Sequence, residues 1–148
     1  MPAVSLSRRA SLLALLALTA LTAACDDAPT GPPTESLACN TTVGNLAAGD
    51  TVTGVLTRES CRLTDGTYAD RWRLVLAAPT ILTIDMLSND VDAYLIVRDV
   101  AGAQVVADDD GAGASDARIT YGFAAGTYYI LANTYYTNEL GGYTIIVE

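Results

Sequence analysis

Apolar and polar side chains alternate with a period of two through much of this 148-residue chain. The pattern is clearest at residues 71–76, where Trp72, Leu74 and Leu76 share one face and two arginines and a valine take the other. Successive side chains of a strand point to opposite faces, so this spacing predicts a strand with one buried face. No segment beyond the first 24 residues shows a sustained 3.6-residue apolar period. The pattern therefore favours strands over helices.

Seven further segments have strand-like composition, and turn residues such as Gly, Pro, Asp and Asn separate them. Short strands at this spacing are typical of an all-β domain. Two antiparallel sheets packed face to face allow each strand to bury one face. We expect Tyr128 and Tyr143 in the core, with their hydroxyls reaching the backbone. The sequence thus predicts an antiparallel β-sandwich of about eight strands, at residues 51–56, 71–76, 81–87, 94–99, 104–107, 118–123, 127–133 and 143–147.

The chain begins with a positive charge followed by an apolar run. Arg8 and Arg9 precede this short run, which ends in LTAAC at 21–25. The run is too short to span a bilayer comfortably. With a cysteine at its end, the segment resembles a bacterial lipoprotein signal peptide. In lipoproteins of this kind cleavage occurs before the cysteine and its sulfur is acylated. The resemblance therefore implies that Cys25 becomes a lipidated N-terminus.

The next segment has the composition of a spacer. Residues 26–36, DDAPTGPPTES, contain three prolines, one glycine and no large apolar side chain. Such a segment favours an extended chain, which at about 3.1 Å per residue would reach roughly 30 Å. We therefore expect a signal peptide at 1–24, a lipidated tether at 25–36 and a single folded domain at 37–148.

The chain carries a large net negative charge. Without residues 1–24, six arginines remain against 17 carboxylates, a net charge of −11, and the chain has no lysine or histidine. An acidic surface repels phosphate backbones and anionic headgroups. Nucleic-acid binding is therefore not expected, and membrane association is expected through the N-terminal lipid alone.

The three cysteines suggest one disulfide. If lipid modifies Cys25, Cys39 and Cys61 remain as an even pair in an oxidising compartment. A bridge between them would close a loop of about 23 residues and contribute roughly 3 kcal/mol. The alternatives are two buried free thiols, or a pairing that includes Cys25.

The sequence lacks the residues that most catalytic mechanisms need. Without histidine or lysine, neither a serine nor a cysteine nucleophile has its usual base. The common zinc sites and the phosphate-binding glycine loop are also missing from the sequence. Paired carboxylates remain, but nothing in the sequence places two of them across a cleft, as a glycosidase requires. We therefore expect a protein that is not an enzyme.

Five short blocks follow one another along the predicted strands and turns. They are Asp70-x-Trp72-x-Leu74, NDVDAYLIVRD at 89–99, DDDG at 108–111, GTYYI at 126–130 and GYTI at 142–145. In the order and spacing of these blocks, the chain from about Val43 to Glu148 is similar to the bacterial pre-peptidase C-terminal domain family. The resemblance implies a jelly-roll-like β-sandwich. Such domains usually trail secreted proteases and other exported enzymes, and some relatives bind calcium or an extracellular polymer. Here we expect the domain to stand alone behind the lipoprotein-type leader.

Carboxylates gather in one glycine-rich loop, which holds Asp108, Asp109, Asp110 and Asp116, while Asp90 and Asp92 precede another strand. Calcium prefers six to eight oxygen ligands, which clustered aspartates and backbone carbonyls can supply. The loop is therefore a candidate calcium site. The alternative is a solvated hairpin whose aspartates cap turns and accept hydrogen bonds from backbone amides.

Tyrosines form the second candidate site. Tyr129, Tyr135 and Tyr136, with Tyr94, are expected to point outward. Exposed tyrosines offer rigid, amphipathic contact area at low entropic cost. A loop that carries them can contact a glycan or an extended peptide, although such rings can also simply cover the outer face of a sheet.

These observations favour a non-catalytic binding protein for a protein, glycan or extracellular polymer, anchored by lipid in the bacterial cell envelope outside the cytoplasmic membrane. A structural or accessory envelope lipoprotein without its own ligand is the alternative, and a carboxylate-based enzyme is a third. The sequence does not choose between the inner and the outer membrane.

Overall fold

The computed structural model describes residues 39–148. The expected signal peptide, the lipidated Cys25 and the tether lie outside the described residues. Residues 39–148 form strands and turns without an α-helix, so this part of the chain holds no helix able to cross a membrane. The strands are β1 (Gly44–Leu46), β2 (Thr51–Leu56), β3 (Cys61–Arg62), β4 (Tyr68–Leu76), β5 (Thr80–Leu87), β6 (Ala93–Arg98), β7 (Gln104–Asp108), β8 (Ala117–Phe123), β9 (Gly126–Thr134) and β10 (Gly141–Val147).

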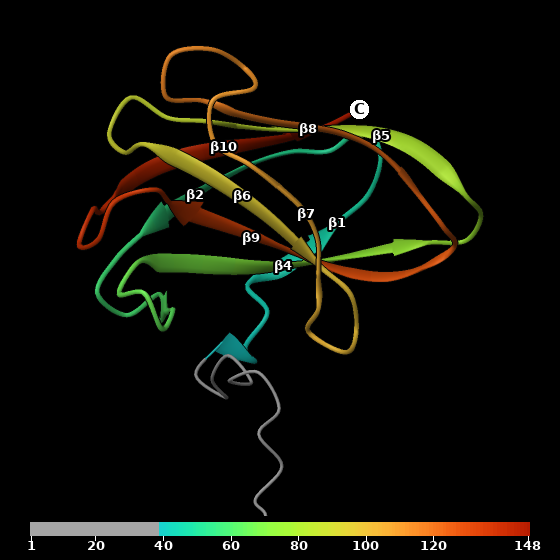
Figure 1. Ribbon diagram of the computed structural model, residues 1–148, viewed down its shortest axis with the longest axis horizontal. Coiled ribbons are helices and arrows are strands. Elements are labelled where there is room, and N and C mark those ends of the chain that lie inside the picture. The colour runs from blue at the N-terminus through green and yellow to red at the C-terminus, as the bar shows by residue number, and fades with distance from the viewer. Residues whose placement is uncertain (1–38) are drawn as a thin grey trace, which may run out of the picture. The chain divides into compact units, whose positions relative to one another are not determined.

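Two sheets pack face to face (Figure 1). The six-stranded sheet has the order β1-β4-β9-β6-β7, with β3 paired to β4, and the four-stranded sheet has the order β2-β10-β5-β8. All of these pairings are antiparallel except that of β1 with β4. The predicted all-β sandwich is confirmed. The described residues form ten strands, two more than the sequence predicts. The additional strands are β1 and β3, which at three and two residues are too short to show an alternating pattern.

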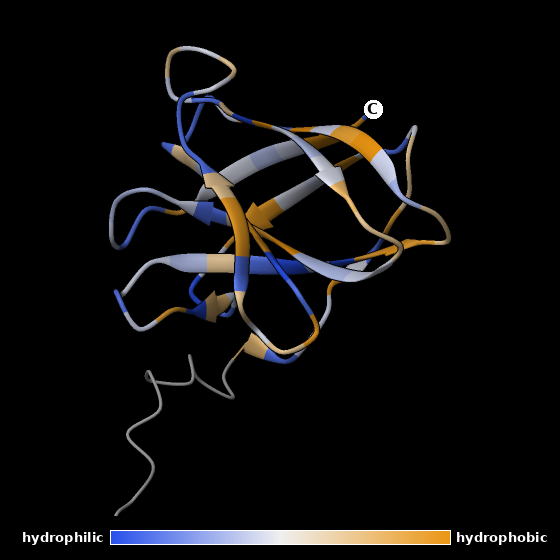
Figure 2. Cartoon of the chain, turned by 45° about the vertical axis from the view of Figure 1, so that its right-hand side comes forward, coloured by the Kyte–Doolittle hydropathy of each residue, from blue (hydrophilic) through white to orange (hydrophobic). Residues whose placement is uncertain are grey.

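The inward faces of the two sheets make the main core. Leu74, Ile84, Leu95, Ile130 and Ile145, one from each of five strands, have no exposed surface. Runs of hydrophobic residues follow the strands that enclose this space (Figure 2). The face predicted from the alternation at 71–76 therefore points inward, as expected for a half-buried strand.

A second apolar cluster lies on the other face of the six-stranded sheet. Leu63, Ala69, Ile96 and Leu131 are buried there, and partly buried residues that include both cysteines pack against them. Cys39 and Cys61 form a disulfide with Cα atoms 5.0 Å apart, the pairing expected from the sequence. The disulfide thus covers part of a sheet face that would otherwise meet solvent.

Tyr143 links the two sheets through a buried polar network. Its hydroxyl donates a hydrogen bond to Asp70 Oδ2 at 2.7 Å and accepts one from Trp72 Nε1 at 3.0 Å. The expected core position of Tyr143 is confirmed, but its hydroxyl meets a carboxylate instead of the backbone. Tyr128 lies half-buried at the edge of the core, and its hydroxyl donates to the Ala124 carbonyl oxygen at 3.2 Å.

Two glycines make room for the aromatic rings of this network. Gly44 pairs with Trp72 across β1 and β4, and Gly54 pairs with Tyr143 across β2 and β10. A Cβ atom at Gly54 would lie 2.2 Å from the hydroxyl oxygen of Tyr143, and one at Gly44 would lie 2.5 Å from the Trp72 ring. Glycine is needed at both positions because the rings lie directly against the partner strand.

Candidate functional site

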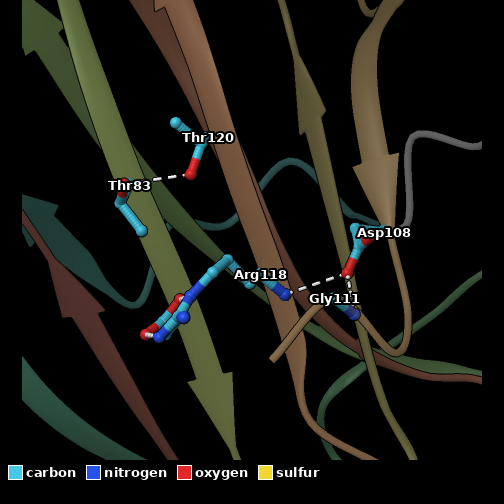
Figure 3. A network of polar contacts seen from close by, with 6 residues as sticks. Thr83, Asp108, Gly111, Arg118 and Thr120 are labelled. Carbon is cyan, nitrogen blue, oxygen red and sulfur yellow. Dashed lines mark hydrogen bonds and ion pairs between the residues drawn. The ribbon is translucent and has the colours of Figure 1, made fainter. Parts of the chain in front are cut away.

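The acidic loop between β7 and β8 is held together by its own carboxylates. Asp108 Oδ2 accepts hydrogen bonds from the backbone amides of Gly111 at 2.7 Å and Arg118 at 2.9 Å (Figure 3). A Cβ atom at Gly111 would lie 2.5 Å from the same oxygen, so the turn closes tightly around this carboxylate. Asp108 therefore ties the end of β7 to the start of β8.

Two other aspartates of this loop, Asp116 and Asp109, also accept hydrogen bonds from backbone amides. Asp116 Oδ1 accepts from the amide of Ser88 at 2.8 Å, and Asp109 Oδ1 accepts from that of Asp110 at 3.1 Å. Residues 39–148 hold no group of three or more Asp, Glu, Cys or His side chains placed to hold a metal ion. The structure does not bring Asp108, Asp109, Asp110 and Asp116 together as ligands. The carboxylates of Asp108, Asp109 and Asp116 instead accept hydrogen bonds from different backbone amides. Calcium binding stays a prediction from the sequence.

Asp90 and Asp92, in the loop between β5 and β6, have different roles. Asp90 Oδ2 accepts a hydrogen bond from the amide of Gly142 at 2.8 Å and so joins this loop to β10. Desolvation, followed by the charges of Asp110 and Asp109, raises the pKa of Asp92. The loops at 88–92 and 108–116 thus form one acidic end of the domain.

One ion pair near this loop is not apparent from the sequence. Arg118 on β8 donates two hydrogen bonds to Asp85 on β5, at 2.7 Å from Nε and 2.5 Å from Nη2. The hydrogen bonds and the charge of Asp85 raise the pKa of Arg118. Thr83 and Thr120 share a hydrogen bond of 3.0 Å on the same pair of strands (Figure 3). These contacts strengthen the pairing of β5 with β8.

Three tyrosines cluster where β9 ends, and we call Tyr94, Tyr135 and Tyr136 the tyrosine patch. The ring centroids of Tyr94 and Tyr135 are 6.1 Å apart, and those of Tyr135 and Tyr136 are 5.1 Å apart, both with edge-to-face geometry. Tyr135 is 51% exposed and Tyr136 is 58% exposed. The rings therefore pack against one another edge to face, and their other faces are exposed to solvent.

The loop that carries Tyr135 and Tyr136 is fixed by hydrogen bonds. The amide of Tyr135 donates to the Asp92 carbonyl oxygen at 2.8 Å, and the hydroxyl of Thr134 donates to the Tyr136 carbonyl oxygen at 2.8 Å. Glu139 Oε2 accepts from the amide of Asp92 at 3.2 Å. The two exposed rings thus project from backbone that is held on both sides.

The acidic end of the domain lies close to the tyrosine patch. Desolvation, followed by the charge of Asp109, raises the pKa of Tyr94, and Tyr135, Asp65 and Asp108 add to this rise. Negative charges thus surround one side of the aromatic surface. A partner group that is apolar or positively charged would meet complementary chemistry there.

Tyr129 does not belong to the tyrosine patch. It lies inside β9, paired with Arg73 of β4 and Arg98 of β6. Tyr135 is six residues further along, which corresponds to about 20 Å of extended chain. The guanidinium of Arg71 lies over the Tyr129 ring, 3.4 Å from its centroid. The structure therefore places Tyr129 apart from Tyr135 and Tyr136, and a ligand contact at each of the three stays a prediction from the sequence.

Comparison with known proteins agrees with this architecture. Residues 68–134 match the family model of the bacterial pre-peptidase C-terminal domain. The matched segment runs from the first residue of β4 to the last residue of β9. It includes the acidic loop, Tyr94 and Tyr129, and ends just before Tyr135. A search of curated proteins gives no match.

Two solved structures align with this chain at low sequence identity. The pre-peptidase C-terminal domain of a collagenase from Bacillus anthracis is similar with a TM-score of 0.56 and 16% identity, over 73% of this chain and 97% of that domain. A periplasmic inhibitor of g-type lysozyme from Aeromonas hydrophila aligns with a TM-score of 0.48 and 15% identity, over 73% of this chain and 96% of its own. The collagenase domain supports the sandwich fold, and its identity is too low to carry over a ligand.

Proposed function

We propose that this chain is a non-catalytic, lipid-anchored binding protein of the bacterial cell envelope, displayed outside the cytoplasmic membrane. It recognises a protein, glycan or extracellular polymer through the tyrosine patch. The observation that carries the proposal is the exposure of Tyr135 and Tyr136 on a loop that hydrogen bonds hold in place. A rigid aromatic surface loses little conformational entropy when it binds.

Two observations support a role without catalysis. The chain contains neither histidine nor lysine, and Cys39 and Cys61 are joined in a disulfide, so neither is a free nucleophile. In the acidic loop, the carboxylates of Asp108, Asp109 and Asp116 accept hydrogen bonds from backbone amides. The match to the pre-peptidase C-terminal domain agrees, because this is a non-catalytic domain.

A position outside the cytoplasm is supported by the disulfide and by the leader-like first 24 residues. Disulfides persist in oxidising compartments and are rare in the cytosol. The acylated Cys25 would hold the domain at the membrane, since the acidic domain itself is repelled by anionic headgroups.

Replacing the acylated cysteine tests the anchor. In the Cys25→Ser variant, expressed in a bacterium that processes lipoproteins, we expect the protein to move from the membrane pellet to the soluble fraction or to remain unprocessed. Mass spectrometry of the membrane-purified wild type should show lipid on Cys25. A wild-type N-terminus without lipid would contradict the anchor and leave the binding role of the domain untouched.

Replacing the two exposed tyrosines tests the binding surface. Capture from envelope extract by the wild-type protein should fall at least about tenfold in the Tyr135→Ala/Tyr136→Ala double variant, because tyrosine is a frequent binding hot spot. Tyr121→Ala is the matched control, since Tyr121 is 38% exposed and lies on β8, away from the patch. Equal capture by all three proteins would favour the alternative role, an accessory lipoprotein without its own ligand.

A further inference from the structure

Carboxylates from the loop after β7 lie beside the tyrosine patch. Leu95 of β6 is paired with Asp108, the last residue of β7. Because β6 and β7 run antiparallel, Asp109 and Asp110 continue toward Tyr94 and the start of β6. Asp110 is exposed, and within the part of the chain that the structure describes its carboxylate forms no hydrogen bond or ion pair. Its negative charge is therefore available at the surface.

Two further carboxylate residues lie next to the loop that carries the exposed tyrosines. The carbonyl oxygen of Asp92 accepts a hydrogen bond from the amide of Tyr135 at 2.8 Å, and the amide of Asp92 donates to Glu139 Oε2 at 3.2 Å. Desolvation raises the pKa of Asp92 most, and the negative charges of Asp110 and Asp109 raise it further. These carboxylates thus act on one another, and a cation placed among them would relieve their repulsion.

No arginine of the described residues balances these charges. Arg62, on β3, has its guanidinium over the ring of Tyr68, 5.7 Å from the centroid, and its Nε donates to the Gly66 carbonyl oxygen at 3.4 Å. Among residues 39–148, the carboxylates beside the tyrosine patch form no ion pair with an arginine. The surface around the patch is therefore complementary to a positively charged partner.

A buried amide without a hydrogen-bond partner lies next to the tyrosine patch. Asn133 of β9 pairs with Tyr94 of β6 and precedes Tyr135 by two residues. Its side chain shares the outer face of the six-stranded sheet with Leu131, since residues two apart in a strand point the same way. Asn133 is fully buried, and neither its Oδ1 nor its Nδ2 has a partner within the described chain. Such a group is costly, so a ligand that displaces the Tyr94 ring and bonds this amide gains free energy.

The same domain shows how an arginine combines with a tyrosine ring. The guanidinium of Arg71 lies over the Tyr129 ring, 3.4 Å from its centroid. A cation over an aromatic face is attracted by the ring, and a guanidinium also carries several N–H donors. Tyr135 and Tyr136 are both exposed, and no arginine of the described residues lies over either ring. Their faces are therefore open to a guanidinium from another molecule.

We propose that the tyrosine patch binds an arginine side chain in a basic segment of a partner protein, an inference that rests on the binding role proposed above. The guanidinium stacks on the exposed rings of Tyr135 and Tyr136, and the carboxylates of Asp92 and Asp110 balance its charge. Its N–H groups supply the donor that Asn133 Oδ1 lacks. Arginine is favoured over lysine because a planar guanidinium stacks on aromatic rings. A neutral glycan would leave the carboxylates without a counter-charge.

Titration of the purified full chain with a capped peptide of alternating arginine and glycine, followed by NMR at low salt, tests this partner. Backbone amides of residues 92–94 and 135–139 and the side-chain amide of Asn133 should shift. The same peptide with lysine should bind more weakly, and the same peptide with glutamine should hardly bind. Raising the salt from about 50 mM to about 500 mM should weaken the arginine peptide at least about fivefold, because salt screens exposed charges.

Two variants separate the charges from the rings. Asp92→Asn/Asp110→Asn should weaken the arginine peptide at least about threefold. Its melting temperature should stay the same or rise, because the repulsion between the two carboxylates is lost. Tyr135→Ala/Tyr136→Ala should weaken the peptide at least about fivefold. Asp99→Asn is the matched control, since it keeps an oxygen for the amides of its own hairpin and lies beyond the other end of β6.

Several outcomes would overturn the proposal. Equal binding of the glutamine peptide would remove the role of the charge, and an equal loss in Asp99→Asn would show only the general attraction of an acidic chain. An unshifted side-chain amide would overturn the contact assigned to Asn133. Failure of the binding role itself looks different, because capture from envelope extract would then not depend on Tyr135 and Tyr136. Capture that needs these tyrosines but is unchanged in Asp92→Asn/Asp110→Asn would keep the binding role and point to a neutral glycan.

Discussion

Tyr143→Phe is expected to lower the free energy of unfolding by about 3 kcal/mol. The substitution keeps the ring and removes only the hydroxyl that joins Asp70 to Trp72. Asp70 is 8% exposed, so its carboxylate would lose a donor where water hardly reaches, and the indole N–H would lose its acceptor. A buried polar group left without its partner costs more than the hydrogen bond itself contributes.

The same variant should change how stability depends on pH. Burial, followed by the hydrogen bond to Asp70, raises the pKa of Tyr143 well above its ordinary value. The unfolded chain then releases the phenol proton at a pH where the folded chain still holds it. The stability that the folded chain gains from holding this proton is therefore present in full below about pH 10 and is lost as the pH rises further. The phenylalanine variant has no such proton, so its stability should fall less steeply in that range.

Urea unfolding between neutral and strongly alkaline pH measures both effects. Tyr121→Phe is the control, because it removes a hydroxyl from a tyrosine of β8 that is 38% exposed. This control should lie within about 0.5 kcal/mol of the wild type. If Tyr143→Phe matched that control at every pH, the buried network would have no part in holding the sheets together.

Loss of the disulfide is the second large effect. The Cys39→Ser/Cys61→Ser variant should lose about 3 kcal/mol, because the bridge closes a loop of about 23 residues in the unfolded chain. For a domain of this size the melting temperature would fall by roughly 10–15 °C. The cover over Leu63, Ala69, Ile96 and Leu131 should also loosen, since the cysteines pack against this cluster.

Thermal and urea unfolding with and without reductant distinguish the covalent bond from the packing. Reductant should destabilise the wild type and leave the double serine variant unchanged. Hydrogen exchange should increase first around β3 and the start of β4, next to the broken bridge. A loss below about 1 kcal/mol would mean that native contacts already restrain residues 39–61 without the bond.

The sequence predicts the strands best where one face meets the core and the other meets water. In β4 the alternation at 71–76 is clear, but the strand begins three residues earlier, at Tyr68. Ala69 and Asp70 are both buried although they point to opposite faces. Because the second cluster covers the outer face there, the contrast that marks a half-buried strand disappears.

The outer face of the six-stranded sheet is also where the sequence is least informative. Ile96 and Leu131 lie on the side opposite the main core, yet both are buried. Their cover comes from Leu63 and the disulfide, which are distant in sequence. A period-two pattern assigns a residue to a face but does not reveal what covers that face.

The candidate sites also include features that the sequence predicts and features that it does not. Exposed tyrosines after β9 are predictable from their place in a polar loop, and Tyr135 and Tyr136 are exposed. The stacking of Arg71 on Tyr129 depends on the register between β4 and β9, which the sequence alone does not give. In the acidic loop, Asp108 caps its own turn at Gly111, whereas Asp116 accepts its hydrogen bond from the amide of Ser88 in another loop.

The bond between Cys39 and Cys61 also decides how the domain responds to mechanical load. A pull on the chain ahead of Cys39 passes through the sulfur atoms to Cys61, whose strand pairs with β4 inside the larger sheet. Residues 40–60, with β1 and β2, are then bypassed by the tension. An oxidised domain held at its amino end would resist stretching through β4 and its neighbours, whereas a reduced one would unravel from β1 first.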